Sequence, residues 1–424
     1  MSIENLKGQS FLIYGLGSSG QSVVRFFKKE NIKNFKVWDD KKKKLFKSKK
    51  AKNLKKTLQD VDYIVLSPGI SLLEKKILLK YKKKIITDID LLYLSNRSFN
   101  TIVVTGTNGK STTCKLISHL LKKNKFEVLL GGNIGFPILD LNIKKNTYVV
   151  IEASSFQLSH SKFISPDYAV LLNITNDHLD WHGSITNYIG SKMKIFENQG
   201  KKQFALLNNK LKKIYFKKNF ASKLILSDKK GYKKIKHKIK NHYLKLTIND
   251  DNMSFAYTFS RLLKINEKNF IKAINSFVGL PHRYEIFLKK KNILFINDSK
   301  ATSFESTKYA LSNSKNVYWI LGGLPKKNDK IILSDIKKNI IKCYLIGKNI
   351  TFFKHQIENK INYSITKTLK KTIIEIIKDM KLLKTKNNTI LLSPASASYD
   401  QFINFEKRGD EFKKLSKLYA RKFI

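Results

Sequence analysis

The stretch Thr105–Thr112, TGTNGKST, follows the apolar run Thr101–Val104 and leads into Ser111–Leu121, where apolar residues recur at helical spacing. The run predicts a buried strand and the periodic segment predicts a helix, so the quoted stretch is the turn that joins them. Its two glycines permit backbone conformations that a side chain would block. Because the turn opens a helix N-terminus, its N–H groups predict an anion site, here a phosphate-binding loop.

The other residues of this loop suit the same chemistry. Lys110 can reach phosphate oxygens, and the hydroxyls of Ser111 and Thr112 can hold Mg²⁺. Only two residues separate Gly106 from Gly109, so the loop is shorter than the common G-x-x-x-x-G-K-[ST] pattern. The alternative is an ordinary strand-to-helix turn, which does not explain why glycines, lysine and hydroxyls occur together.

Length and composition are those of an ordinary globular protein. The chain has 424 residues, of which 42% are hydrophobic. Its two cysteines, Cys114 and Cys343, lie far apart and form no metal-binding pattern, which favours a reduced compartment. We find neither a signal peptide nor an apolar stretch of transmembrane length. The sequence therefore predicts a cytoplasmic protein without membrane insertion.

The formal net charge is +51, with 83 Lys and Arg against 32 Asp and Glu. Such a balance often indicates a nucleic-acid partner. Here the excess is mostly lysine spread along the whole chain, and aromatic residues do not interleave with it as stacking platforms. A codon bias toward AT-rich triplets produces the same pattern. We expect no nucleic-acid partner, and a basic, nucleotide-regulated nucleic-acid-binding protein is kept as an alternative. The charge would also favour capture of an anionic substrate.

Apolar strand-like runs alternate with helical patterns from end to end, which predicts an α/β fold with mainly parallel sheets. We expect three domains, at residues 1–95, 96–279 and 280–424.

The first segment carries Gly15-x-Gly17-x-x-Gly20 between a predicted strand and a predicted helix, and its second strand ends at Asp39. This resembles a dinucleotide fingerprint, which combines a tight turn, a close backbone approach to phosphates and a later acidic residue. NAD, FAD and nucleotide-sugar diphosphates all fit the pattern. An NAD-dependent dehydrogenase is therefore a further alternative, although it leaves the phosphate loop unexplained. A third strand, within Tyr63–Ile70, ends at the same carboxyl edge.

In the second and third segments, polar residues follow successive predicted strands. Because the carboxyl ends of parallel strands meet at one edge of a sheet, these side chains should converge. A third α/β domain facing the second would enclose a nucleotide between them. The residues concerned are Asn133, Glu152, Ser154, Gln157, Asp177, His178 and Asp180 in the second segment, and Asp298, Lys300, Lys326 and Ser398 in the third.

A series of motifs resembles, in order and over essentially the whole chain, those of the Mur ligases of peptidoglycan synthesis. They are TGTNGKST, GGNIG, the Glu-x-Ser-Ser-Phe-Gln run, NDHLD, GLPHR, NDSKAT and LLSPASASYDQF. Within this family the chain is most similar to the ligases that add D-glutamate to UDP-N-acetylmuramoyl-L-alanine, and the last motif favours D-glutamate. A sister ligase that adds another amino acid, or a folylpolyglutamate-synthase-like protein, is the alternative.

The resemblance implies Rossmann-like N- and C-terminal domains around a central P-loop ATPase domain. It also implies the reaction: ATP phosphorylates the free carboxylate of UDP-N-acetylmuramoyl-L-alanine, and the amine of D-glutamate then displaces phosphate. A carboxylate that attacks a phosphoryl group is repelled by its charge, so cations must gather there. ATP and Mg²⁺ are the implied cofactors. The implied partners are small-molecule substrates only, and we expect a monomer.

The resemblance further implies residue roles. ATP would be bound by Gly106, Thr107, Asn108, Gly109, Lys110, Ser111, Thr112, Asn252, Arg283 and Asp298. The UDP-substrate would be bound by Ser18, Ser19, Asp39, Asp40, Ser71, Asn133 and Ser154. D-Glutamate would be bound by Lys300, Thr302, Lys326, Ser398 and Phe405. The metal would be held by Ser111, Glu152, His178 and Lys192 as its carbamate, and the catalytic residues would be Lys110, Asn133, His178 and Lys192.

Lys192 is the candidate for a carbamate derived from CO₂, because this family carbamylates a lysine that follows the DHLD motif. Its context, KMKIFEN, fits that lysine better than the context of Lys194 does. The surrounding stretch reads as an amphipathic helix, with Tyr188, Met193 and Phe196 available to one apolar face. Carbamylation needs a neutral amine, so we expect desolvation and nearby positive charge to lower the pKa of Lys192.

The chain departs from the family pattern at two places. Phe255 stands where the family usually has a second Asn near adenine, and it cannot hydrogen-bond the base. Leu324 and Pro325 precede Lys326 where an acidic or polar residue is usual. These departures leave adenine recognition and the shape of the second loop open.

Overall fold

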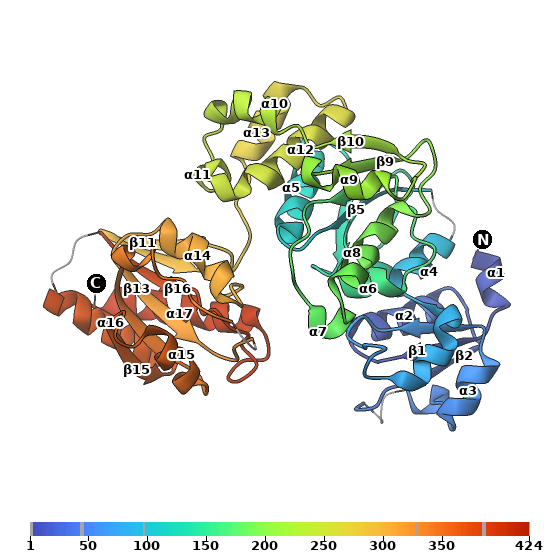
Figure 1. The fold of residues 1–424 in the computed structure, drawn as a ribbon, viewed down its shortest axis with the longest axis horizontal. Coiled ribbons are helices and arrows are strands. Elements are labelled where there is room, and N and C mark those ends of the chain that lie inside the picture. Colours follow the sequence, from blue (N-terminus) through green and yellow to red (C-terminus); the bar gives the residue numbers. More distant parts are fainter. Residues whose placement is uncertain (1–2, 43–45, 96–97, 327–328, 384–386, 424) are drawn as a thin grey trace. The chain divides into compact units, whose positions relative to one another are not determined.

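The computed structural model describes residues 3–42, 46–95, 98–326, 329–383 and 387–423. The chain forms two compact units, Met1–Phe277 and Val278–Ile424 (Figure 1). The strands of the described residues form three sheets, in which neighbouring strands are parallel except for β11 and β12. The predicted α/β fold with mainly parallel sheets is therefore confirmed. The predicted boundary after residue 95 falls within unit 1 and stays a prediction, as does the one after residue 279.

The first sheet of unit 1 has four strands in the order β2-β1-β3-β4. Its central strand β1 is buried along its whole length, because helices cover the sheet and Phe11 packs against Phe27 and Tyr63. The strands are β1 (Phe11–Tyr14), β2 (Phe35–Trp38), β3 (Tyr63–Leu66) and β4 (Ile85–Ile86), and the helices are α1 (Ile3–Lys7), α2 (Ser18–Lys29), α3 (Leu54–Asp60) and α4 (Asp88–Leu94).

The second sheet of unit 1 has six strands in the order β10-β9-β8-β5-β7-β6. The strands are β5 (Asn100–Thr105), β6 (Val128–Gly132), β7 (Tyr148–Glu152), β8 (Tyr168–Leu171), β9 (Phe204–Leu207) and β10 (Lys223–Leu226). The helices are α5 (Lys110–Lys123), α6 (Ser155–His160), α7 (Leu179–His182), α8 (Ile185–Met193), α9 (Lys212–Phe216), α10 (Lys229–Ile235), α11 (His242–Lys245), α12 (Asp250–Leu262) and α13 (Glu267–Asn275).

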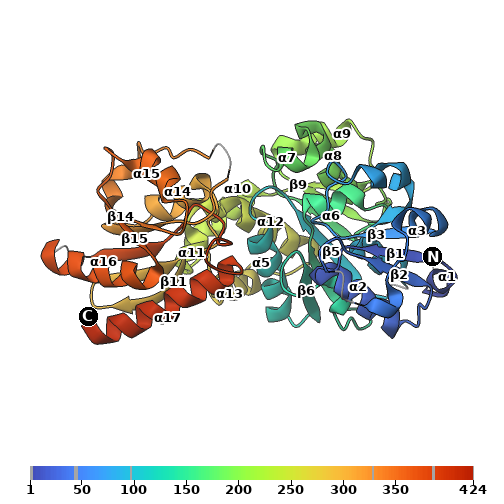
Figure 2. The same ribbon diagram turned by 90° about the horizontal axis from the view of Figure 1, so that it is seen from below.

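The alternating side chains of strand β5 show which helices cover each face of this sheet. Successive side chains of a strand point to opposite faces. Ile102 and Val104 pack with residues of α5 and α12, whereas Val103 packs with residues that include Met193 of α8. Helices α5 and α12 therefore lie together on one face, as Figures 1 and 2 show, and α6 and α8 lie on the other. The loop after β5 emerges between these two layers.

Unit 2 contains the third sheet, with the order β11-β12-β16-β13-β14-β15. Its helices pack on both faces, with Trp319 and Leu391 in one core cluster and Tyr318 and Ile390 in the other. The strands are β11 (Glu285–Lys290), β12 (Ile293–Asn297), β13 (Val317–Gly322), β14 (Ile340–Ile346), β15 (Tyr363–Lys367) and β16 (Asn388–Leu392), and the helices are α14 (Phe304–Ser312), α15 (Ile350–Ile357), α16 (Leu369–Leu383) and α17 (Phe405–Phe423).

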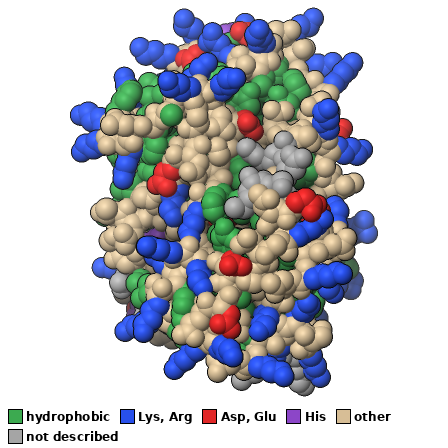
Figure 3. All heavy atoms as spheres, turned by 90° about the vertical axis from the view of Figure 1, so that its right-hand side faces the viewer, with side chains coloured by type: hydrophobic (Ala, Val, Ile, Leu, Met, Phe, Trp, Pro, Cys, Tyr) green, Lys and Arg blue, Asp and Glu red, His purple; other side chains and the backbone are tan. Residues whose placement is uncertain are grey.

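The positive charge is dispersed over the surface, as the spread of lysines along the sequence predicts. On the face drawn in Figure 3, Lys and Arg side chains are spread over the whole surface rather than gathered into one patch. No helix among the described residues combines the length and apolarity that a membrane span requires.

Candidate active site

The phosphate loop connects β5 to α5. Gly106 and Gly109 both have positive φ, at 156° and 85°. A side chain at Gly109 would clash with Asn252 of α12, so this position needs glycine for its conformation and for the close packing. The first N–H groups of α5 have no partner within the helix, which makes its N-terminus suited to a phosphate. The predicted strand, turn and helix are confirmed at this point.

Two lysine amines meet at one carbonyl oxygen of this loop. Lys110 Nζ donates to the oxygens of Gly106 and Thr107, both at 2.8 Å. Lys192 Nζ, which comes from α8, donates to the same Gly106 oxygen, also at 2.8 Å. Two ammonium groups on one acceptor repel each other, so this geometry favours the loss of one proton. The more deeply buried amine should lose it, because burial also removes the water that stabilises its charge.

That amine belongs to Lys192, which is 1% exposed. Burial, and then the charge of Lys110, lower the pKa of Lys192 to about 6, while Asp177 opposes the shift. Tyr188 places its ring 4.7 Å from Lys192 Nζ and its hydroxyl 2.9 Å from Thr107 Oγ1, which ties α8 to the loop. The expected depression of this pKa by desolvation and positive charge is present in the structure.

The carboxyl end of β7 contributes a buried carboxylate. Glu152 accepts a hydrogen bond from Asn133 Nδ2 at 3.0 Å through Oε1. Its Oε2 is buried and has no hydrogen-bond partner in the described part of the chain. A buried carboxylate oxygen without a partner is costly, and Mg²⁺ prefers such hard ligands. Glu152 therefore fits a divalent cation, and the buried Ser111 lies at the start of the neighbouring helix.

The NDHLD segment follows β8 and ends in α7. His178 has φ 52° and lies 3.4 Å from Asp177 through Nε2 and Oδ2. Its ring is 4.7 Å from that of Phe156 in α6, so it is close to the Glu-x-Ser-Ser-Phe-Gln run. Asp180 is exposed in α7. Among the described residues no group of three or more His, Cys, Asp and Glu could hold a metal by themselves. This is compatible with Mg²⁺, which is usually bound by one or two carboxylates together with water and substrate phosphates.

Helix α6 is fixed at its start by reciprocal hydrogen bonds. Ser154 caps the helix by accepting from Gln157 N at 3.2 Å, and Ser154 N donates back to Gln157 Oε1 at 3.1 Å. His182 Nε2 lies 3.0 Å from Ser155 Oγ, and His182 Nδ1 lies 3.4 Å from Ser191 Oγ. His182 therefore connects α6 to the residue that precedes Lys192, a position that the motif analysis did not identify.

Asp39, which follows β2, hydrogen-bonds the glycine fingerprint of the first sheet. Asp39 accepts a hydrogen bond from Leu16 N at 2.6 Å, so this carboxylate stabilises the glycine-rich loop directly. Asp40 accepts from Trp38 Nε1 at 2.9 Å and pairs with Lys75 at 2.8 Å. A side chain at Gly20 would clash with the Gly15 carbonyl, which explains the third glycine of the motif.

Of the remaining residues predicted to bind the UDP-substrate, Ser19 and Ser71 connect to residues from the part of unit 1 that carries the second sheet. Ser18 and Ser19 begin α2, and Ser19 hydrogen-bonds the buried Asp88, which also hydrogen-bonds Gln157. Burial raises the pKa of Asp88 to about 6. Ser71 Oγ donates to the Trp181 carbonyl at 3.4 Å. Asp88 was missed by the motif analysis, although it starts a helix directly after β4 within the run TDID.

The predicted residues of unit 2 form a second group. Asp298 follows β12 and accepts from Ser393 Oγ at 2.7 Å and from Tyr284 N at 3.0 Å. Burial raises its pKa to about 7, while these hydrogen bonds and Arg283 oppose the shift. Lys300 Nζ lies 3.8 Å from the centroid of the Phe405 ring. Ser398 is buried, Thr302 is half-buried before α14, and Lys326 is exposed.

The loop at Leu324-Pro325 has a defined shape. Leu324 and Ala397 exchange backbone hydrogen bonds of 2.8 and 3.0 Å as an isolated antiparallel bridge. The loop that leads to Lys326 is therefore joined to the loop that carries Ser398. At the other departure, Phe255 is fully buried in the core beneath α5, whereas Asn252 accepts from Thr113 Oγ1 at 3.2 Å. Phe255 therefore packs in the core and does not form a stacking surface for a base.

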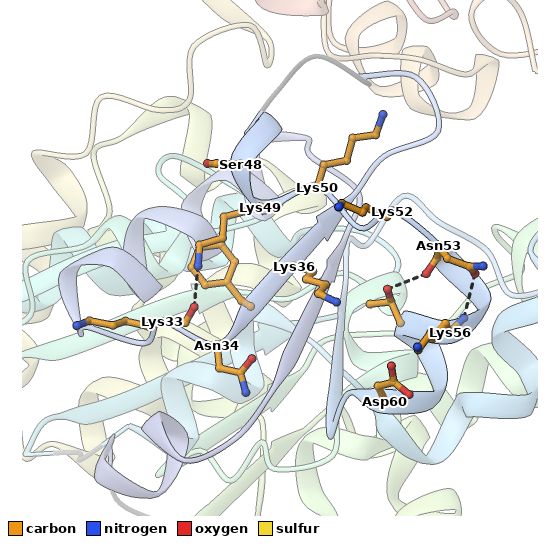
Figure 4. Close-up of a pocket in the computed structure, with 12 residues that line it drawn as sticks. Lys33, Asn34, Lys36, Ser48, Lys49, Lys50, Lys52, Asn53, Lys56 and Asp60 are labelled. Carbon is orange, nitrogen blue, oxygen red and sulfur yellow. Dashed lines mark hydrogen bonds between the residues drawn. The ribbon is translucent and has the colours of Figure 1, made fainter.

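A separate pocket, shown in Figure 4, lies at the amino end of β2. Asp39 follows the opposite, carboxyl end of that strand. Lysines dominate its lining, and Lys49 Nζ donates to the Lys33 carbonyl at 2.8 Å. None of the motif residues lines it, so we assign it no part in the reaction.

Comparison with known proteins agrees with this geometry. Residues 9–87 match the family model of the Mur ligase MurD-like N-terminal domain, and residues 104–275 match that of the Mur ligase middle domain. The chain is 36% identical to the UDP-N-acetylmuramoylalanine--D-glutamate ligase of Wolbachia sp. subsp. Brugia malayi, with 97% of each chain covered. It is also 36% identical to the ligase of the same name from Rickettsia felis, over 97% of this chain and 98% of that one.

Solved structures show the same fold. MurF from Thermotoga maritima in complex with ADP superposes with a TM-score of 0.57 at 16% identity, covering 98% of this chain and 99% of that one. UDP-N-acetylmuramate-alanine ligase MurC from the same organism gives a TM-score of 0.56 at 16% identity, covering 97% and 100%.

Proposed function

This chain belongs to the Mur ligase family, and we propose that it adds D-glutamate to UDP-N-acetylmuramoyl-L-alanine in peptidoglycan synthesis, with hydrolysis of ATP to ADP and phosphate. The choice of D-glutamate rests on the near-full-length similarity to ligases of that name. The phosphoryl-transfer step rests on one structural observation. Lys110 and Lys192 meet at the phosphate loop after β5, and the buried carboxylate Glu152 ends the neighbouring strand β7.

In the first step, an oxygen of the substrate carboxylate attacks the γ-phosphorus of ATP, and the bond from that phosphorus to the β–γ bridging oxygen breaks. Lys110 compensates the negative charge that builds up on the phosphoryl oxygens. Asn133 positions the attacking carboxylate. Ser111, Glu152 and His178 would hold Mg²⁺, which supplies further charge neutralisation when it is bound.

In the second step, the amine of D-glutamate attacks the acyl carbon. Phosphate leaves, the nitrogen loses a proton and an amide remains. Lys300, Thr302, Lys326, Ser398 and Phe405 would bind the amino acid, while Asp298 would hold the ribose and Arg283 the phosphates. Asn252, which lies against the phosphate loop, would complete the ATP site.

We further propose that Lys192 is carbamylated by CO₂ and that the carbamate serves as a metal ligand. A neutral amine is the form that attacks CO₂, and with a pKa of about 6 the amine of Lys192 is mostly neutral at neutral pH. A carbamate would also replace the repulsion between Lys192 and Lys110 by an attraction.

The function is tested by incubating the purified protein with ATP, Mg²⁺, UDP-N-acetylmuramoyl-L-alanine and one amino acid at a time. We expect phosphate release with D-glutamate only, and a product whose mass has increased by one glutamate residue. Release with a different amino acid would assign the chain to a sister ligase. Phosphate release that depends on added DNA would instead favour the nucleic-acid alternative.

A further inference from the structure

Arg408 of α17 is buried beneath the loops that carry the proposed D-glutamate residues. It is 1% exposed. Its Nε donates to Ser299 Oγ at 3.0 Å, and its Nη2 donates to the carbonyls of Ser299 and Ser396 at 2.9 and 2.8 Å. One guanidinium thus joins the loop after β12 to the loop after β16.

Each residue to which Arg408 donates lies within two positions of a proposed substrate residue in the sequence. Ser299 stands directly before Lys300, and its hydroxyl donates to the Phe405 carbonyl at 2.8 Å. Ser396 precedes Ser398 in the same loop. A side chain at Gly323, in the loop before Lys326, would come within 3.1 Å of Arg408 Nη1. These three loops are therefore packed around the same side chain.

The charge of Arg408 has no close counter-charge. It forms no ion pair with a carboxylate in the described residues, and its buried Nη1 has no hydrogen-bond partner there. Asp400 acts on it only at longer range, and burial lowers its pKa to about 10, so it stays protonated at neutral pH. The three hydrogen bonds of Arg408, to two carbonyls and one hydroxyl, could also be donated by a neutral side chain, so they do not explain why this residue is charged. A buried, uncompensated cation is costly unless an anion approaches it.

Building on the proposed function, we propose that Arg408 is a positioning residue for the amino-acid substrate. It holds the three loops in register, and its uncompensated charge attracts the carboxylates of D-glutamate, which carries a net negative charge at neutral pH. This favours an anionic amino acid over a neutral one.

The test compares Arg408→Gln, Arg408→Lys and wild type in the phosphate-release assay, with the KM of each substrate measured separately. We expect Arg408→Gln to raise the KM for D-glutamate about tenfold or more, with kcat and the KM values for ATP and the UDP-substrate within about threefold of wild type. Arg408→Lys should fall between wild type and Arg408→Gln, because it keeps the charge but loses the guanidinium geometry. The matched control is Arg421→Gln, an exposed arginine of the same helix, which should behave as wild type.

An unchanged KM for D-glutamate in Arg408→Gln would overturn the inference. An equal rise in the KM for D-glutamate in Arg408→Gln and Arg408→Lys would show that the charge of Arg408 does not contribute to binding the amino acid. If Arg408→Gln does not fold, Arg408→Lys decides whether the guanidinium geometry positions the loops: a selective rise in the KM for D-glutamate supports this role, and an unchanged KM overturns it. Absence of D-glutamate-dependent phosphate release in wild type would instead contradict the proposed function.

Discussion

Lys192 in unit 1 and Arg408 in unit 2 are both buried basic side chains, and the nitrogens of both donate to backbone carbonyls. Burial pushes both pKa values down, to about 6 for Lys192 and about 10 for Arg408. At neutral pH the lysine is therefore mostly neutral, whereas the arginine keeps its charge.

The difference follows from the intrinsic chemistry of the two groups. The pKa of an ammonium is close enough to neutrality for desolvation to move it across pH 7, and that of a guanidinium is not. The same burial therefore yields a mostly neutral amine at the phosphate loop and a fixed positive charge beneath the proposed amino-acid site.

The largest effect should come from Lys192. We expect Lys192→Ala to lower kcat at least about 100-fold, because the proposed carbamate, which would help to organise the metal site, cannot form without the lysine. A small carboxylate such as acetate should partly restore the activity of Lys192→Ala. It should not restore Lys192→Arg, whose side chain fills the space and stays charged. Labelled bicarbonate should give a carbamate resonance by NMR in wild type only.

The neighbouring Lys194 provides the control. Its Nζ donates to the carbonyls of Ser159 and Ser161 at 2.6 and 3.2 Å, away from the loop. Lys194→Ala should keep kcat within about threefold of wild type even if stability falls. Full activity of Lys192→Ala, or of wild type from which CO₂ has been rigorously removed, would contradict the carbamate.

Lys110→Ala should also nearly abolish ATP turnover. The charge of Lys110 opposes the phosphate charge, and its loss should cost several kcal/mol at the transition state, or about 100-fold or more in kcat. The fold should persist, because the lost hydrogen bonds are confined to one loop. Removing this charge should also raise the pKa of Lys192, which a pH titration of carbamate formation would detect. Turnover within about threefold of wild type would argue against the phosphate-loop assignment.

Asp298 extends the comparison to a buried acid. Its pKa is raised from 3.8 to about 7, so the unfolded chain releases this proton near pH 4 while the folded protein holds it up to about pH 7. The contribution to stability is therefore complete below pH 4 and is lost as the pH rises through 7. Asp298→Asn stays neutral, so its unfolding free energy relative to wild type should increase between pH 4 and pH 8 by up to about 4 kcal/mol.

Denaturant unfolding at the two pH values measures this difference. The exposed Asp335→Asn in the same unit is the control and should show no such gain. An equal stability difference at both pH values would mean that Asp298 is ionised in the fold throughout this range.

Much of the fold and part of the site were predictable because their signals are local. The run before TGTNGKST forms β5, and α5 begins at Lys110 within the quoted stretch. The polar residues after successive strands were predictable as a group, since parallel strands end at the same edge. Adenine recognition was not predictable at Phe255, because only packing shows that its ring is buried in the core.

Asp88, His182 and Arg408 illustrate what the motif analysis missed. Each acts by hydrogen-bonding residues distant in sequence, and Arg408 reaches Ser299 across 109 positions. The sequence around an aspartate, a histidine or an arginine does not reveal which distant residues its side chain will hydrogen-bond. The loops that these three residues contact, and the burial of their side chains, are known only from the folded structure.

The sequence alone determined the chemistry that is available: a glycine-rich loop after a strand, a lysine and hydroxyls at a helix start, and acidic and amide groups at strand ends. These features depend on neighbouring residues and on side-chain periodicity, which can be read along the chain. The tertiary structure decided the protonation states. Lys192 becomes neutral because it is buried against Gly106, 86 positions away, and beside a second lysine. Desolvation and the field of nearby charges depend on distances in space, and only folding sets these distances.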